Sequence, residues 1–204
     1  MRAIRANAEL IARNPVAVGD PRLEEQLSFI TSGIQNLELL ADGLANYSLA
    51  LHIETSAFRA VQMDVLLRLV LAKLRKELQA SGAEVTYDPL PRVQGNPDRL
   101  AQVFENLILN AIRHKGADAP RVQVSADREG ANWRFSVRDN GPGIEAGYLE
   151  RIFKPFERLR GKQIPGAGMG LPIAREIVER HGGKIWAEPP GGAGATFCFT
   201  LPAS

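Results

Sequence analysis

The segment from Val137 to Leu171 decides how this sequence is interpreted. It opens with Val137-Arg138-Asp139-Asn140-Gly141-Pro142-Gly143-Ile144 and closes with Gly166-Ala167-Gly168-Met169-Gly170-Leu171, after which apolar residues recur at helical spacing. A helix entered through glycines exposes unpaired N–H groups at its positive end, where the backbone can approach a phosphate closely. Glycine clusters more often mark ordinary turns. Here, however, a carboxylate-glycine turn, a phenylalanine-containing segment and a second glycine cluster come in one order, which predicts a nucleotide-binding loop system.

The composition excludes several classes of protein. With 204 residues, 45% of them hydrophobic and 24% charged, the chain is typical of a soluble globular protein with a real core. A net charge of +2 is too small to suggest a nucleic-acid partner or membrane-surface binding. No apolar run approaches the roughly 20 residues of a membrane helix, and no secretory signal opens the sequence. The single cysteine, Cys198, excludes a disulfide framework and is interpreted as a small core residue. We therefore expect a cytoplasmic protein, or a fragment of a larger one, with no membrane contact from this segment.

The longest periodic run begins at Leu23 and ends at Leu51. Its members alternate spacings of four and three over about four heptads: Leu23, Leu27, Ile30, Ile34, Leu37, Ala41, Leu44, Ser48 and Leu51. Leu40 and Tyr47 widen this stripe, which favours a helical hairpin over residues 1–54 that pairs with a second copy into a homodimer. The alternative is a long helix packed on the core of its own domain. The polar stretch 54–57 separates the hairpin from residues 58–204 and favours the first interpretation.

From residue 58 to residue 204 strand and helix patterns alternate. Strands are predicted at 58–61, 85–87, 92–94, 122–125, 133–137, 184–187 and 196–200. Helices are predicted from Asp64, as a capping residue, to Leu78, from the Asn96-Pro97 start to near Gly116, and over 171–180. The second helix turns a set of apolar residues inward: Leu100, Val103, Phe104, Leu107, Ile108 and Ala111. The pattern predicts an α+β fold, a sandwich with helices on one face of a mixed sheet.

Polar residues interrupt the apolar pattern of that second helix. Asn106 and Asn110 lie four residues apart on one face, and Arg113 and His114 come about one turn later. An amide oxygen can coordinate magnesium, and a guanidinium can bind phosphate oxygens bidentately. The alternative is that these amides only satisfy buried backbone groups. At the end of a strand, Asp139 could accept a hydrogen bond from an exocyclic amine such as that of adenine.

Four segments together resemble the nucleotide-binding motifs of sensor histidine kinases. They are Asn106-Leu-Ile-Leu-Asn110-Ala-Ile-Arg-His114, Asp139-Asn-Gly-Pro-Gly143, Phe153-Lys-Pro-Phe156 and Gly166-Ala-Gly-Met-Gly170-Leu171, in the order that the family has. The resemblance covers the chain from about residue 58 to residue 202, and the run from Ile177 to Trp186 looks most similar to the phytochrome-related branch. It implies an ATP-binding domain of the histidine-kinase ATPase type over residues 58–204, with ATP and Mg²⁺ as its cofactors.

The resemblance also assigns roles to individual residues. Asn110 matches the magnesium-binding asparagine, with Asn106 beside it, and Asp139 matches the adenine-reading aspartate. Arg113 lies where a basic residue of the family meets the ATP phosphates, and Asn106 and Arg113 are expected to be the catalytic residues. The other positions implied for the nucleotide site are His114, Gly141, Gly143, Ile144, Phe156, Gly166, Gly168, Met169, Gly170, Leu171 and Thr196. For Thr196, a contact with adenine through water and a plain strand role remain equally open.

The segment between Gly143 and Gly166 corresponds to a lid over ATP. Residues 161–166 have glycines at both ends and few apolar anchors, which predicts easy local opening. Arg158, Arg160 and Lys162 could reach the phosphates, or could be solvated loop charges. Phe153 and Phe156 are expected to pack the lid against the sheet.

The amino-terminal hairpin also resembles the dimerisation and phosphotransfer hairpin of these kinases, which implies a response-regulator receiver domain as a partner. The phospho-accepting histidine and its neighbouring acid would fall before Met1. The three histidines present, His52, His114 and His181, lie outside the matching position. We therefore expect either a truncated chain or a kinase core without its own acceptor, unable to phosphorylate itself.

Other functions remain to be compared with the kinase. ATP-hydrolysing relatives of the gyrase and chaperone type carry a glutamate as general base four residues before the magnesium asparagine, where this chain has Asn106. Glu105 is one position away and is interpreted as a surface residue. A dimeric ATP-binding or receiver-docking module without autokinase activity is the main alternative. Serine kinases of the anti-sigma type share the motifs but lack the heptad hairpin.

Overall fold

The computed structural model describes residues 21–53, 58–157, 167–189 and 194–203. The predicted first helix, the polar stretch 54–57 and residues 158–166, the last part of the predicted lid, lie outside these residues. Contacts divide the chain into two compact units, Met1–Ala45 and Asn46–Ser204. The division falls before the boundary near residue 54 that the sequence suggests, and the extent of the two domains stays a prediction.

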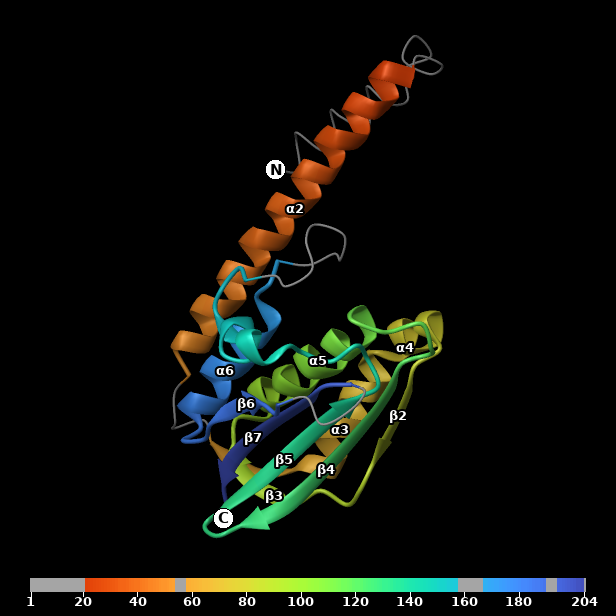
Figure 1. The fold of residues 1–204 in the computed structure, drawn as a ribbon. Coiled ribbons are helices and arrows are strands. Elements are labelled where there is room, and N and C mark those ends of the chain that lie inside the picture. The colour runs from red at the N-terminus through yellow and green to blue at the C-terminus, as the bar shows by residue number, and fades with distance from the viewer. Residues whose placement is uncertain (1–20, 54–57, 158–166, 190–193, 204) are drawn as a thin grey trace. The chain divides into compact units, whose positions relative to one another are not determined.

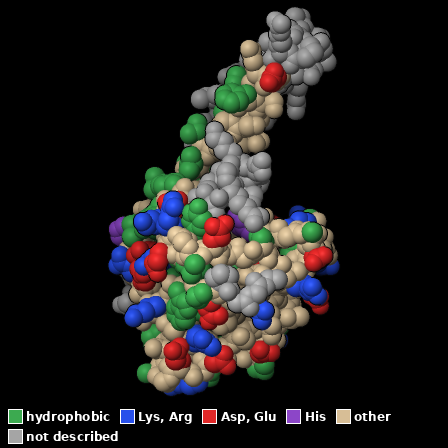
Figure 2. Space-filling model, in the orientation of Figure 1, with side chains coloured by type: hydrophobic (Ala, Val, Ile, Leu, Met, Phe, Trp, Pro, Cys, Tyr) green, Lys and Arg blue, Asp and Glu red, His purple; other side chains and the backbone are tan. Residues whose placement is uncertain are grey.

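Helix α2 runs without interruption from Pro21 to Leu51 and carries the whole predicted heptad pattern. Leu27 and Ile34 are buried. Many other apolar side chains on it are exposed, as Figure 2 shows along the described part of the helix: Phe29, Ile30, Leu37, Leu39, Leu40, Leu44 and Leu49. Contiguous apolar surface of this kind commonly marks a contact surface. No helix of the described residues is long and apolar enough to cross a membrane.

The second unit is built on a five-stranded sheet with the strand order β2-β4-β5-β7-β6 (Figure 1). Its strands are β2 (Glu84–Tyr87), β4 (Arg121–Glu129), β5 (Asn132–Asp139), β6 (Ile185–Ala187) and β7 (Thr196–Pro202). β2 is parallel to β4, and the other neighbouring strands are antiparallel. The sheet is therefore mixed, and the predicted hairpin of β4 and β5 is confirmed.

Helices cover one face of this sheet (Figure 1). They are α3 (Met63–Lys73), α4 (Arg75–Ser81), α5 (Pro97–Arg113) and α6 (Gly170–Arg180), with short 3₁₀ turns η2 (Ala146–Tyr148) and η3 (Arg151–Phe153). A separate antiparallel pair, β1 (Arg59–Gln62) and β3 (Arg92–Gly95), precedes α5. The α+β architecture predicted from the sequence is confirmed.

The core lies between the sheet and α5. Phe104 of α5 meets Phe135 and Phe199 of the sheet edge-on, with ring centroids 6.3 and 5.8 Å apart. The rings of Phe135 and Phe199 stack at 4.8 Å. Aromatic pairs in these geometries contribute about 0.5–1.5 kcal/mol each beyond the burial of their surface. All six residues that the sequence assigns to the inner face of α5 are buried, so that prediction is confirmed.

The start of α5 is fixed by the residues that the sequence indicates. The Asn96 side-chain oxygen accepts hydrogen bonds from the backbone N–H groups of Asp98 (3.1 Å) and Arg99 (3.2 Å). Pro97 occupies the first turn, where its missing N–H removes a donor that would have no partner in the helix. The helix ends at Arg113, slightly earlier than predicted.

The predicted helix from Asp64 to Leu78 is wrong in two respects. Asp64 does not cap a helix: α3 starts after Gln62, and the Asp64 carboxylate accepts the N–H of Leu90 at 2.6 Å. The helix is also broken at Leu74, where α3 ends and α4 begins. Leu74 is buried in the core. Neither glycine nor proline signals this break, so tertiary packing decides it.

Replacing Asn96 with alanine should lower the free energy of unfolding by about 1 kcal/mol, because two N–H groups at the start of α5 lose their acceptor. Both tryptophans, Trp133 and Trp186, lie in the second unit, so urea denaturation followed by tryptophan fluorescence reports on that unit. Asn96→Ser keeps a side-chain acceptor and is the control. Equal stability of Asn96→Ala and the wild type would contradict the capping role.

Candidate nucleotide-binding site

Asp139, the last residue of β5, is buried with only 7% of its surface exposed. Its Oδ1 atom accepts hydrogen bonds from the N–H of Gly141 at 2.8 Å and the N–H of Ala195 at 3.0 Å. The second carboxylate oxygen makes no hydrogen bond within the described part of the chain. The carboxylate is therefore held in one orientation with one oxygen left to accept from a ligand.

Glycines let three backbone segments meet around this carboxylate. A Cβ atom on Gly141 would lie 2.8 Å from the His114 carbonyl oxygen and 2.9 Å from Asp139 Oδ1. Gly143 has φ +77°, and a Cβ atom there would lie 3.1 Å from the Gly194 carbonyl oxygen. The end of α5, the turn after β5 and the approach to β7 thus converge, as the predicted roles of Gly141 and Gly143 require.

The sequence interpretation missed the contribution of Gly194 and Ala195. Gly194 has φ +94°, and a Cβ atom there would collide with the Asp139 carbonyl oxygen. Ala195 supplies the second N–H to the Asp139 carboxylate. Thr196, a predicted site residue, comes directly after it as the first residue of β7. A glycine beside a strand is the only local signal for this contact, and it is a weak one.

The two asparagines of α5 lie beside its buried face, and both are partly buried. Nδ2 of Asn106 is buried and has no hydrogen-bond partner in the described structure. A Cβ atom on Gly170, the first residue of α6, would lie 3.5 Å from Asn106 Oδ1. The Asn106 amide therefore lies next to the start of α6 with an unused donor, and the notion that it merely satisfies buried backbone groups is not supported.

The start of α6 provides further unpaired donors. Gly168 has φ +69°, and Met169 precedes the helix without a side-chain hydrogen bond that caps it. The first N–H groups of a helix lack partners within the helix and attract anions. Met169 is buried and Leu171 is half-buried against the core, so these two side chains shape the helix start. Gly166 lies outside the described residues.

Arg113 and His114, the two basic residues at the end of α5, differ in exposure and in their contacts. Arg113 is exposed, and its guanidinium makes no hydrogen bond or ion pair with the described residues. His114 is half-buried and ends the helix, with its N–H donated to the Asn110 carbonyl oxygen at 2.9 Å. The structure thus brings the His114 backbone to Gly141, and leaves Arg113 available at the surface.

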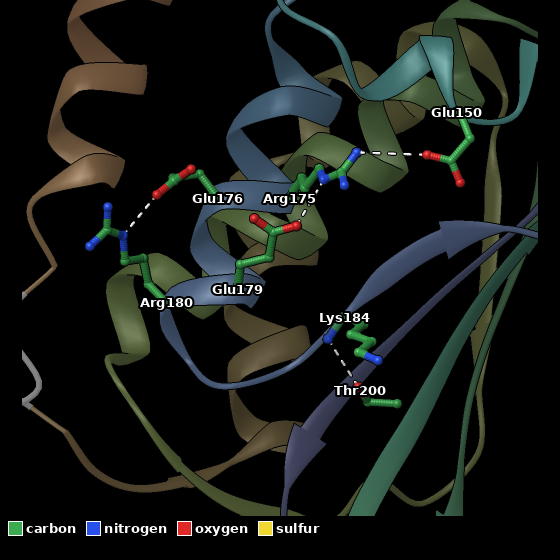
Figure 3. A network of polar contacts seen from close by, with 7 residues as sticks. All are labelled: Glu150, Arg175, Glu176, Glu179, Arg180, Lys184 and Thr200. Carbon is green, nitrogen blue, oxygen red and sulfur yellow. Dashed lines mark hydrogen bonds and ion pairs between the residues drawn. The ribbon is translucent and has the colours of Figure 1, made fainter.

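The segment that leads into the predicted lid is anchored to α6. The Arg175 guanidinium donates to Glu179 at 2.8 Å and pairs with Glu150 at 4.0 Å (Figure 3). It also lies 6.0 Å from the centre of the Phe153 ring. The hydrogen bond to Glu179 raises the pKa of Arg175 above its ordinary value. These contacts attach the first part of the predicted lid to the middle of α6.

The two phenylalanines of this segment behave differently. Phe153 is buried and meets Phe197 of β7 edge-on, with centroids 6.5 Å apart, so its predicted packing against the sheet is confirmed. Phe156 is 50% exposed and has φ +65°, so its predicted packing is wrong. An ion pair between Arg151 and Glu157 at 3.2 Å spans the segment and accompanies this outward position. Ile144, at the other end of the segment, packs against the core.

Two other candidate chemistries are excluded by geometry. Glu105, predicted to lie on the surface, is only 18% exposed and binds Lys73 of α3 at 2.7 Å, so it faces away from Asn106. Cys198 is buried within the sheet, and burial raises the pKa of its thiol to about 11, which excludes a reactive thiolate at neutral pH. No group of three or more His, Cys, Asp or Glu side chains in the described ranges could hold a metal ion.

A hollow of about 290 Å³ lies on the opposite face of the sheet. Arg121, Gln123 and Arg138 line it and alternate along their strands with residues that face the core. Glu84 and Thr86 of the edge strand complete its rim. Val122, Asp139 and Asn140 also line the hollow, so it adjoins the end of β5 where Asp139 lies.

Comparison with known proteins agrees with this arrangement. Residues 95–204 match the family described as histidine kinase-, DNA gyrase B- and HSP90-like ATPase. Cyanobacterial phytochrome A from Nostoc sp. (strain PCC 7120) is 39% identical over 184 residues, which cover 90% of this chain and 24% of that protein. The chain thus spans about a quarter of the length of this curated relative.

Solved histidine kinases have the same fold. Full-length ShkA in complex with AMPPNP is similar with a TM-score of 0.71 and 25% identity, over 98% of this chain and 42% of that one. Histidine kinase ThkA in complex with the response regulator TrrA is similar with a TM-score of 0.68 and 25% identity, over 99% of this chain and 61% of that one. The chain therefore belongs to the family of histidine kinase-, DNA gyrase B- and HSP90-like ATPases and carries the histidine-kinase type of its catalytic domain.

Proposed function

We propose that this chain is the ATP-binding catalytic core of a two-component sensor histidine kinase, which transfers the γ-phosphoryl group of ATP to a histidine for relay to a response regulator. The proposal rests on two polar groups, each of which has hydrogen-bonding capacity left for a ligand. The Asp139 carboxylate is oriented by two backbone N–H groups, and the Asn106 amide has a buried donor without a partner beside the start of α6 in the described structure. One accepts from a base, and the other donates to a phosphate.

Each end of the nucleotide has its own residues. At the adenine end, Asp139 accepts from the exocyclic amine, and Gly141 and Gly143 allow close approach of the backbone. At the phosphate end, the N–H groups that come after Gly168 and the Asn106 amide donate to phosphate oxygens. Arg113, exposed one turn beyond Asn110, adds a positive charge. We include Thr196 and His114 in the site because they adjoin Ala195 and Gly141.

The residues present also fit a magnesium ion that accompanies the nucleotide. Asn110 offers an amide oxygen, a ligand that Mg²⁺ accepts, and no cluster of acidic side chains in the described structure would hold the ion alone. Mg²⁺ usually binds through few protein ligands together with phosphate oxygens and water. When bound, it neutralises charge on the phosphates. The protein's own contribution is to position the γ-phosphoryl group and to stabilise its charge.

The main alternative is a dimeric ATP-binding or receiver-docking module without autokinase activity. The prepared nucleotide groups favour an active kinase core, since a scaffold has no need of an oriented carboxylate and an unpaired buried amide. ATP hydrolysis of the gyrase type is disfavoured because Glu105 is held by Lys73. The structure of ThkA with TrrA supports a receiver domain as partner, and a cytoplasmic location for this segment is part of the same proposal.

Asp139→Asn should weaken ATP binding by roughly 10- to 100-fold, since a hydrogen bond to a charged group contributes about 1.5–3 kcal/mol. The asparagine oxygen would keep the bonds from Gly141 and Ala195, so its NH₂ group would face the amine of adenine, donor against donor. Calorimetric titration with Mg·ATP measures the change. Asp127→Asn, an exposed aspartate on β4, is the matched control. Equal affinity of Asp139→Asn and the wild type would refute the assignment of the adenine site.

The chain should form a homodimer through α2, because its exposed apolar side chains are buried when two hairpins form a four-helix bundle. Light scattering measures the mass in solution. Replacing Leu37 and Leu44 together with glutamate should shift the protein to monomer. The matched control replaces the exposed polar residues Gln26 and Gln35 with glutamate. A wild type that stays monomeric at high concentration would count against this interface.

The chain by itself should bind ATP but not phosphorylate itself, because none of its three histidines matches the position of the family's acceptor, and His114 belongs to the end of α5. His181 is buried and uses both ring nitrogens, and His52 is exposed near the end of α2 with Nδ1 bound to the Ser48 carbonyl oxygen at 2.8 Å. Phosphoryl transfer requires an acceptor placed in line. Incubation with radiolabelled ATP, followed by acid and base treatment, detects a phosphoramidate.

A hairpin that carries the family's acceptor histidine, added as a separate chain, is the positive control for this experiment. It should become labelled. Label on this chain alone that is labile to acid and stable to base would overturn the prediction. Mapping that label to His52 would identify the acceptor.

A further inference from the structure

His181 comes directly after the last residue of α6 and is buried, with 4% of its surface exposed. Both nitrogens of its ring are used. Nε2 accepts the backbone N–H of Asn96 at 3.0 Å, so the proton sits on Nδ1, which donates to the Ile177 carbonyl oxygen at 2.7 Å. This arrangement requires the neutral imidazole, because a proton on Nε2 would point at the N–H of Asn96.

Two further segments enclose the ring. Phe58 stacks on it with a centroid distance of 4.4 Å and an interplanar angle of 10°. Gly95 passes so close that a Cβ atom there would lie 2.8 Å from His181 Cδ2 and 2.7 Å from Leu100 Cδ1. The imidazole therefore contacts the residue before β1, the end of β3, the start of α5 and the end of α6.

These contacts join the two helices that carry the proposed phosphate end of the site. Asn96, which His181 binds through its backbone, caps α5 with its side chain. Asn106 lies about 15 Å further along that helix at the usual rise per residue, beside Gly170 at the opposite end of α6. A shift of the α5 start relative to the α6 end would change the distance between Asn106 and Gly170.

We propose that His181 is a positioning residue for the nucleotide site: its neutral imidazole fastens the start of α5 to the end of α6 and links both to Phe58, where the chain enters β1. The role rests on the proposed ATP-binding function. His181 does not touch the nucleotide, and it acts through Asn96 and the helix that this residue caps. Phe58 is the residue through which a displacement of the preceding chain would reach α5.

The stability that the His181 contacts contribute should fall as the pH is lowered. Burial lowers the pKa of His181 below its ordinary value of 6.5, and the hydrogen bond to the Ile177 carbonyl opposes this in smaller part. No charged side chain contributes: Arg180 is held by Glu176 at 2.7 Å and Arg99 by Gln102 at 3.2 Å, while Asp98, Arg59 and Arg92 on the neighbouring elements have no effect on this pKa. The neutral ring therefore contributes its full stabilisation above about pH 6.5, the ordinary pKa of histidine. This contribution is lost as the pH falls below that value, because the unfolded chain then binds a proton that the buried ring does not.

The experiment compares His181→Leu and His181→Gln with the wild type in the full chain. Mg·ATP affinity should fall roughly tenfold in His181→Leu, since a misplacement of about 1 Å can cost up to 100-fold. The Asn96 amide should also exchange its hydrogen faster. His181→Gln keeps an acceptor but cannot titrate, so it should retain affinity at pH 7.5 and lose less of it than the wild type at pH 5.5. Because ATP itself also titrates, the affinity of His181→Gln is divided by that of the wild type at each pH, and this ratio is compared between pH 7.5 and pH 5.5.

His52→Gln, at the exposed histidine directly after α2, is the matched control and should show the pH profile of the wild type. Phe58→Leu should raise exchange at the Asn96 amide as well, because the stacked ring is lost. Absence of ATP binding by the wild type would refute the proposed function. Hydrogen exchange at the Asn96 backbone amide would still test whether His181 holds the start of α5. The proposal would be overturned if His181→Leu kept the ATP affinity and the Asn96 amide exchange rate of the wild type. It would also be overturned if the ratio of the His181→Gln affinity to the wild-type affinity were the same at pH 5.5 and pH 7.5. If His181→Leu fails to fold, the comparison of His181→Gln with the wild type tests the proposal.

Discussion

Packing of α5 on the sheet is the contact on which the rest of the second unit depends. Residues three and four apart on a helix share one face, so burial of Leu107, Ile108 and Ala111 sets the rotation of α5 about its axis. That rotation places Asn106 on the flank of the helix, beside Gly170. The proposed phosphate end of the site is thus a consequence of hydrophobic packing, since the apolar residues of α5 determine where its polar residues lie.

The proposed adenine end depends on a different constraint, the close approach of backbone segments from distant parts of the sequence. The Asp139 carboxylate receives one N–H from its own turn and one from Ala195, far along the chain. Any side chain at Gly141 or Gly194 would meet backbone oxygens within this arrangement. The carboxylate is held in one orientation by these two bonds, which suits recognition of a planar base by one acceptor.

Buried polar atoms of Asn106 in α5 and of His181, which follows α6, show how a structural group differs from one proposed to bind a ligand. Buried polar atoms in folded proteins nearly always have partners. His181 obeys that rule, since each ring nitrogen has a hydrogen bond, and its effect on the nucleotide is indirect. Nδ2 of Asn106 does not follow this rule, since it has no hydrogen-bond partner among the described residues. A phosphate oxygen could accept its hydrogen bond. The contrast separates His181, which we propose holds the two helices together, from Asn106, which we propose binds the nucleotide.

The sequence by itself determined the elements and the chemical types in the site. The inner face of α5, the Asn96 cap, the β4–β5 hairpin and the glycine-flanked start of α6 depend on local periodicity and turn chemistry, which neighbouring residues decide. Only the tertiary structure decided which distant groups meet. Asp64 binds Leu90, Glu105 binds Lys73, Phe156 turns outward and Ala195 supports Asp139. These pairings depend on how helices and strands are placed against one another, and the energy of such long-range contacts leaves no periodic signal in the residues that make them.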